Sequence, residues 1–174
     1  MRYAFTAIPI VFATFVVHEF AHLATGTLLG YEMKMTLNMV TLASDTYQTV
    51  AHAMWVSAAG PVVTILQALV GAHFLRKTGD RRLYPLLFGA AFTRVLAFAV
   101  SVFHRNDEAR ISEWLGIGWI SLPALVCAGL VCLTWRVSRR EQYTLRFNLL
   151  NWLIASVAVT VLVFADQLWK VRLL

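Results

Sequence analysis

The sequence predicts an all-α polytopic membrane protein with about five transmembrane helices. Of its 174 residues, 59% are hydrophobic and only 14% are charged, whereas soluble domains carry about 25% charged residues. The apolar residues form five long runs, each near or above the roughly 20 residues that cross the hydrocarbon core of a bilayer. The basic residues stand mainly in short connections between these runs, as membrane topology requires. The formal charge of +6 therefore does not indicate a nucleic-acid partner.

The five predicted spans are joined by short connections, except for a longer segment after the first. They cover residues of about 4–29, 51–75, 83–103, 115–135 and 147–168.

The first span carries the most informative residues of the chain, His18, Glu19 and His22. On a helix the two histidines are one turn apart and share a face, so both imidazoles can bind one zinc ion with the glutamate beside it as general base. Ionisable side chains are costly within a span, so three of them in five residues require a reason. Two alternatives stay open: a chance match to a short pattern, and a polar cluster that only hydrogen-bonds neighbouring helices.

The segment of about 31–50 has a different texture, because residues 33–39 alternate strictly between apolar and polar side chains. This period is typical of a strand, and Asn38 could mark a turn. A strand at membrane depth must have its backbone groups satisfied by protein or water. We therefore expect a short β-hairpin packed against the helices at the interface, with a plain surface loop as the alternative.

The second and third spans contain residues that predict close packing. Gly60 and Pro61 stand together in the second span. Proline interrupts the helical hydrogen-bond ladder, and glycine lets another backbone come close. Arg94 stands midway along the third span, so it should face the bundle interior and find a carboxylate or carbonyl partner. We interpret this arginine as structural.

Two histidines do not complete a hydrolytic zinc site, which typically has three protein ligands and an open position for water. The third span returns to the side of His18 and His22, and Asp107 is the best-placed carboxylate at its end. The alternative for Asp107 is a solvated charge at a helix end. Glu108 and His104 are the next candidates. Asp45 and His52 are less favourable, and Asp166 is too remote along the chain to be judged. His73 falls at the opposite end of the membrane and has no predicted partner.

Together these residues resemble the site-2 protease family of intramembrane zinc metalloproteases. That family has a His-Glu-x-x-His helix, then a Gly-Pro helix, then a helix that ends in an Asn-rich turn with Asp-Gly. Here His18–His22, Ala59-Gly60-Pro61 and Asn106–Ile111 follow in the same order in the first three spans. Residues 33–39 fall where the family places a membrane-associated hairpin. The chain departs from the pattern at Thr64, where the family often has Asn, and in its altered third motif, so it resembles a divergent, minimal member.

The resemblance implies a metalloprotease core of residues 1–111 that contains three helices, followed by two additional transmembrane helices in 112–174. It implies one Zn²⁺ per chain, held by His18, His22 and Asp107, with Glu19 as the catalytic general base. Gly60 and Pro61 would support the site structurally.

The implied substrate is a transmembrane segment of another membrane protein. A transmembrane helix keeps its carbonyls in its own hydrogen bonds, so it must unwind before attack. An extended segment could then pair with the predicted strand, where Lys34, Thr36 and Asn38 would bind substrate. The implied setting is the lipid bilayer of a bacterial cell membrane, in which the protein is multi-pass; the oligomeric state stays open.

Two other classes of function compete with the protease. One is a catalytically silent relative that acts as a membrane-protein binding or assembly subunit, which the altered third motif favours and the intact Glu19 opposes. The other is a small transporter or channel subunit, although transporters often contain internal repeats and none is visible here. The membrane orientation also stays open, because the basic residues predict the opposite orientation to the one usual in the family.

Overall fold

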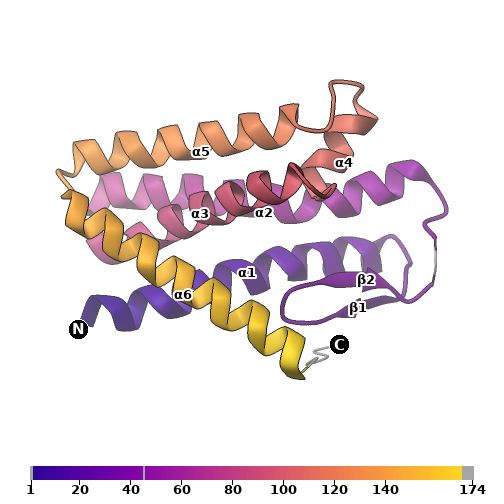
Figure 1. Cartoon of the computed structure of the whole chain (residues 1–174), viewed down its shortest axis with the longest axis horizontal. Helices are drawn as coiled ribbons and strands as arrows, with labels where there is room; N and C mark the ends of the chain where they lie inside the picture. The colour runs from indigo at the N-terminus through magenta and orange to yellow at the C-terminus, as the bar shows by residue number, and fades with distance from the viewer. Residues whose placement is uncertain (1, 45, 170–174) are drawn as a thin grey trace.

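The computed structural model describes residues 2–44 and 46–169. This part of the chain is an all-α bundle with one small β-hairpin between the first two helices, as the sequence predicts (Figure 1). The elements, in chain order, are α1 (Arg2–Leu28), β1 (Met33–Met35), β2 (Val40–Leu42), α2 (Val50–Thr78), the 3₁₀ helix η1 (Arg81–Leu83), α3 (Tyr84–Ser101), α4 (Asp107–Trp114), α5 (Ser121–Arg140) and α6 (Leu145–Trp169).

Five segments are long and apolar enough to cross a membrane: α1, α2, η1 with α3, α5 and α6. Their outward faces carry large apolar side chains, such as Phe5, Trp55 and Leu125, which are between 65% and 76% exposed. Apolar surface of this extent is suited to hydrocarbon and unfavourable in water. The five predicted spans are therefore confirmed as helices of the required length and composition.

The fourth predicted span is wrong at its start, because α5 begins at Ser121 and not near 115. The preceding residues form the separate short helix α4, which the sequence analysis did not predict. Asn106 caps α4 by accepting a hydrogen bond from the Ala109 N–H at 3.0 Å. Gly116 and Gly118 then take positive φ angles of 73° and 80°, which only glycine adopts at low cost, so the chain turns before α5.

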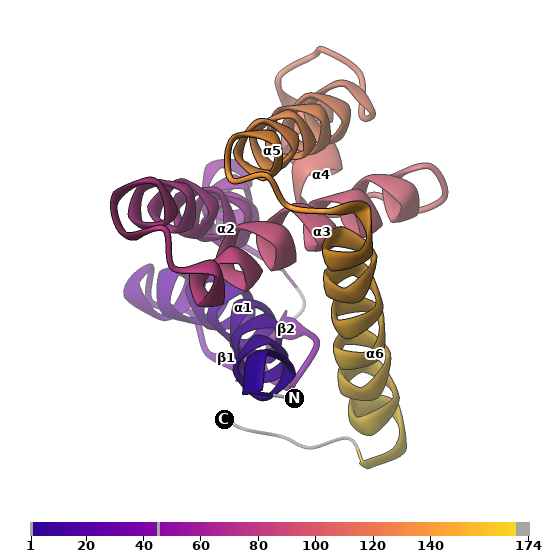
Figure 2. The same ribbon diagram turned by 90° about the vertical axis from the view of Figure 1, so that its left-hand side faces the viewer.

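The helices pack around two apolar clusters. The first lies between α2, α3 and α5 and includes Leu75 and Leu87, both fully buried. The second joins α1, α3 and α6 around Val11 and Phe92. Figure 2 shows α6 diverging from α5 after their connection and passing α3 toward α1. The second cluster thereby fixes α1 against α3 and α6 just before the turn that carries His18.

The hairpin pairs β1 with β2 antiparallel, with Met35 opposite Val40. The predicted strand over 33–39 is too long: β1 ends at Met35, and the Thr36 N–H donates to the Met39 carbonyl at 2.9 Å to close the turn that contains Asn38. The alternation of burial also ends at Met35, because Thr36, Leu37 and Asn38 are all half-buried. Met35 packs against α1 and α2 in a third apolar cluster, so the hairpin lies against the helices as expected.

Candidate metal centre

Helix α1 carries His18, Glu19 and His22 into the interior of the bundle. All three side chains are buried, whereas Phe20 between them is 53% exposed on the outer face. The two imidazole rings lie edge to face with centroids 4.8 Å apart. The helical spacing alone therefore brings the two histidines together.

Helix α2 approaches the histidines most closely at Gly60. A Cβ atom added there would lie 2.5 Å from Cε1 and 2.6 Å from Nε2 of His18, closer than real contacts allow. Pro61 has no N–H to donate to the preceding helical turn. In that turn the Val56 carbonyl accepts a hydrogen bond from Nδ1 of His22 at 2.6 Å. Gly60 thus lies directly against the imidazoles.

The partners of the two imidazoles determine where their protons are. The Val56 carbonyl can only accept, so His22 carries its proton on Nδ1. Nδ1 of His18 lies 2.9 Å from Oγ1 of Thr64, which donates its own proton to the Gly60 carbonyl at 3.0 Å. Thr64 therefore accepts from Nδ1–H of His18. Both Nε2 atoms are left with a lone pair, which is the form that binds metals.

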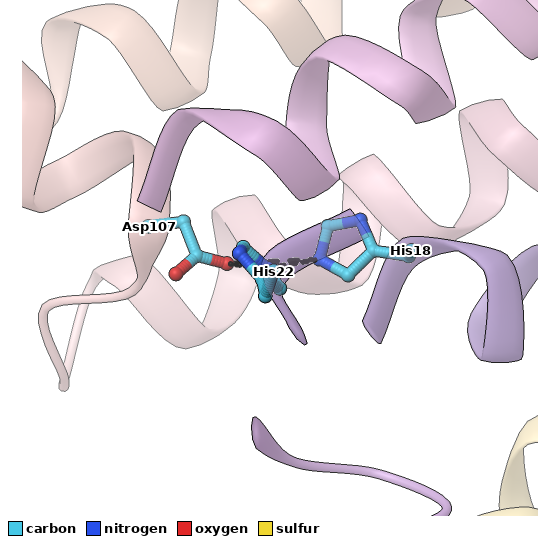
Figure 3. Close-up of side chains that lie close together, drawn as sticks. All are labelled: His18, His22 and Asp107. Carbon is cyan, nitrogen blue, oxygen red and sulfur yellow. Dashed lines mark hydrogen bonds and ion pairs between the residues drawn. The ribbon is translucent and has the colours of Figure 1, made fainter. Parts of the chain in front are cut away.

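Asp107, the first residue of α4, completes the group (Figure 3). Its Oδ2 lies 3.3 Å from Nε2 of His22 and 3.6 Å from Nε2 of His18, and the two Nε2 atoms are 3.2 Å apart. A tetrahedral zinc ion with bonds of about 2.0–2.1 Å holds its ligand atoms about 3.3–3.4 Å apart. These three acceptors could therefore hold a metal ion and leave a fourth position for water.

The electrostatics of Asp107 suit this role. Burial raises the pKa of its carboxyl, but hydrogen bonds from His18 and His22, which form when an Nε2 atom carries a proton, lower it by more, so the pKa lies well below the usual range. Asp107 is therefore ionised, and an ionised carboxylate is the form that coordinates metals.

Glu19 lies beside this group on a small cavity of about 60 Å³. His18, Thr93 and Arg94 also line the cavity, and the backbone N–H of Val40 in β2 lies near the Glu19 carboxylate. A polar cavity of this size can hold ordered water. The carboxylate predicted as a general base thus borders a cavity that His18 also lines.

The other predicted ligands lie elsewhere. Glu108 is directed away from the histidines and pairs with Arg94, with Nη1 and Oε1 2.6 Å apart, which gives Arg94 the carboxylate partner expected for it. His104 lines a separate surface pocket. Three others have partners elsewhere: His52 Nδ1 contacts the Tyr31 hydroxyl, Asp166 contacts the hairpin turn, and His73 lies edge to face against Phe74. Asp45 lies outside the described residues.

The predicted substrate-binding residues lie on or near β1. Lys34 is exposed in the middle of that strand, whereas Thr36 and Asn38 belong to the turn. Oγ1 of Thr36 donates to Asp166 of α6 at 3.0 Å. The strand residue whose N–H faces Glu19 is Val40 of β2, which the alternating pattern did not identify.

Sequence reasoning also missed the two groups that orient the imidazoles. Thr64 follows Gly60 by one helical turn and so shares its face, which is a signal that spacing could have provided. The Val56 carbonyl gives no such signal, because a backbone acceptor is present at every residue. Asn106 could have been recognised as an N-cap, because asparagine is a preferred capping residue and two acidic residues follow it.

Comparisons with known proteins found no matching family model, no similar curated protein and no similar solved structure. Any function assigned to this chain therefore depends on the geometry and chemistry of the residues described above.

Proposed function

We propose that this protein is an intramembrane zinc metalloprotease that cleaves transmembrane segments of membrane proteins. The observation that carries the proposal is the spacing of three acceptor atoms, from His18, His22 and Asp107, at 3.2–3.6 Å from one another. Two imidazoles and one carboxylate form a ligand set of hydrolytic zinc sites, and Glu19 adjoins them. A polar cluster that only links helices would pair donors with acceptors, whereas here three acceptors face one another.

The chemistry would be divided among few residues. When bound, zinc supplies Lewis-acid activation of a water molecule and of the scissile carbonyl. Glu19 would take the proton of the attacking water and deliver it to the leaving amine. Thr64 and the Val56 carbonyl would keep both imidazoles in the tautomer that leaves Nε2 free.

The hairpin offers an edge for an unwound substrate. Residues 36 and 39 and residues 32 and 43 are hydrogen-bonded pairs, so the alternation of an antiparallel ladder directs the N–H and C=O groups of Val40 and Leu42 away from β1. Because the Val40 N–H lies near Glu19, this outer edge of β2 adjoins the site. An extended peptide could add to it as a further strand. The proposed substrate contact is thereby on β2, across the hairpin from Lys34.

The test has two parts, both with the full chain purified in detergent. Elemental analysis should find about one zinc per chain in the wild type, as a single site requires, and much less in a His18→Ala/His22→Ala double variant. Glu19→Gln should keep its zinc and lose cleavage of co-expressed single-span membrane proteins, because loss of a general base costs about 10²–10⁴-fold in rate.

The outcomes distinguish the candidate functions. Identical fragments and identical bound partners for the wild type and Glu19→Gln would remove the protease and leave a binding or assembly subunit. A wild type that binds no zinc would remove the metal centre itself.

A further inference from the structure

We infer that the buried ion pair between Arg94 and Glu108 is a positioning device that presents Asp107 to the metal. This inference rests on the proposed zinc site. Arg94 and Glu108 would act through Asp107 and not touch the metal or the substrate, so both are positioning residues.

The pair is buried too deeply to be explained by its own strength. The two side chains are 7% and 3% exposed, and Nη1 of Arg94 lies 2.6 Å from Oε1 of Glu108. Within the described chain, Nε of Arg94 and Oε2 of Glu108 have no hydrogen-bond partner. Desolvation offsets much of the attraction in such a pair, and apolar replacements are often neutral or stabilising. A pair buried this deeply therefore indicates a role besides stability.

The residues on either side of Asp107 are both fixed to α3. Nδ2 of Asn106 donates to the Ala97 carbonyl at 2.9 Å, and Glu108 pairs with Arg94. Ala97 and Arg94 are three residues apart and so lie on one face of α3. With its two neighbours held on α3, Asp107 is the residue of this turn that is directed toward His18 and His22 on α1 (Figure 3).

Glu108 also neutralises the positive charge of Arg94 beside the site. The guanidinium lines the small cavity that Glu19 and His18 share. Without Glu108, this cation would lie buried and unpaired beside His18 and the Glu19 carboxylate, and its positive charge would oppose a metal ion there. Pairing with Glu108 neutralises that charge. It also explains why the second of two adjacent carboxylates is not the ligand.

The inference is tested by zinc affinity, measured on the full-length protein in detergent by competition with a chelator. The main variant, Arg94→Gln/Glu108→Gln, removes both charges together and so leaves no unpaired ion. We expect its zinc affinity to fall about 10–100-fold, as for other groups that orient metal ligands, while the thermal unfolding temperature of the zinc-free protein stays near that of the wild type. Arg94→Lys, which keeps the charge but lacks the planar fork, should show a smaller loss of the same kind.

The matched control is the second ion pair of α4, between Arg105 and Glu113. Nε of Arg105 lies 2.7 Å from Oε2 of Glu113, but the two side chains are 55% and 48% exposed, and Glu113 lies at the other end of the helix. Arg105→Gln/Glu113→Gln should leave the zinc affinity unchanged.

A thermodynamic cycle separates positioning from general support of the fold. In an Asp107→Ala background the third ligand is absent, so removing the ion pair should cost no further zinc affinity. If the two losses add, or if the double glutamine variant binds zinc as tightly as the wild type, the inference is wrong. Should the double variant fail to fold, Arg94→Lys carries the same cycle with the same criteria. A wild type without zinc affinity would instead overturn the proposed function.

Discussion

At the residue scale, the site depends on atoms that neither bind a metal nor react. His18 and His22 have different partners on α2, a hydroxyl of Thr64 and a carbonyl of Val56, and both partners accept a hydrogen bond from Nδ1–H. The same turn of α2 contains Gly60, whose missing side chain leaves room for both rings. The arrangement of α2 thus sets the protonation and the position of ligands that belong to α1.

Gly60→Ala should abolish stoichiometric zinc binding. The added methyl group would meet His18 at 2.5–2.6 Å, so the imidazoles must move away from each other and from Asp107. Elemental analysis after purification measures the effect. The control is Gly129→Ala in α5, where the new Cβ has no neighbour within 4 Å, and this variant should retain zinc. Normal zinc content in Gly60→Ala would contradict the described approach of α2.

Thr64→Val should weaken zinc binding about 10–100-fold, the usual effect of losing a partner of a ligating histidine. Valine has the shape of threonine but cannot accept from Nδ1–H of His18, so the tautomer and ring orientation are no longer fixed. Chelator competition measures the affinity. Thr64→Ser keeps the hydroxyl and should bind zinc nearly as the wild type does; equal losses in both variants would mean that packing, not the hydrogen bond, matters.

The three candidate metal ligands could be predicted from the sequence, but their contacts with α2 could not. The placement of His18 and His22 on one face follows from helical periodicity alone, and the return of the third span indicated Asp107. Along the chain, Thr64 is 46 residues and Gly60 about 40 residues from the histidines that they contact. These contacts depend on the distance between α1 and α2. That distance follows from packing, which no local pattern encodes.

At the scale of elements, the hairpin is held between α1 and α6. Met33 and Met35 pack on the α1 side. On the other side, Asp166 of α6 accepts hydrogen bonds from the Leu37 N–H at 2.9 Å and from Oγ1 of Thr36 at 3.0 Å. One carboxylate thus satisfies two donors of the turn and fixes α6 to the segment that adjoins Glu19.

Asp166→Ala should loosen the hairpin turn without affecting zinc binding by His18, His22 and Asp107. Loss of an acceptor that leaves two donors unpaired costs about 1–3 kcal/mol locally. Hydrogen exchange of residues 33–42 should therefore accelerate, whereas the zinc content stays that of the wild type. Gln167→Ala, at the exposed neighbouring position, is the control and should leave exchange unchanged. Unaltered exchange in Asp166→Ala would show that apolar packing alone holds the hairpin.

Elements were predictable where one property extends over many residues. A membrane span is identified by hydropathy over about 20 residues, so the five spans could be predicted. The alternation of apolar and polar residues predicted the hairpin. Helix α4 has eight residues of polar sequence, and its existence depends on the Asn106 cap and on Gly116 and Gly118. The contact of Asp166 with Leu37 joins residues 129 apart and has no local signal.

At the scale of the whole molecule, the fold and the metal group are built from separate interactions. The two apolar clusters between the long helices contain none of the three candidate ligands. The metal group, by contrast, joins α1 to α4, a short helix that caps one end of the bundle. Removal of the metal should therefore affect one end of the molecule and leave the helices in place.

Chelation of zinc from the purified protein should leave the helix content by circular dichroism unchanged and lower the thermal unfolding temperature. A ligand that binds only the folded state stabilises it by about 2.7 kcal/mol at 100 times its Kd, and this stabilisation grows with the logarithm of the ligand concentration. The unfolding temperature should therefore rise in the same way as zinc is added. Hydrogen exchange should accelerate in α4 and in the second half of α1, where the ligands lie, and stay unchanged in α5. His18→Ala/His22→Ala provides the control, because zinc should no longer shift its unfolding temperature. Loss of helix content on chelation would mean that the metal holds the bundle together, and a zinc-dependent shift in the double variant would place the ion elsewhere.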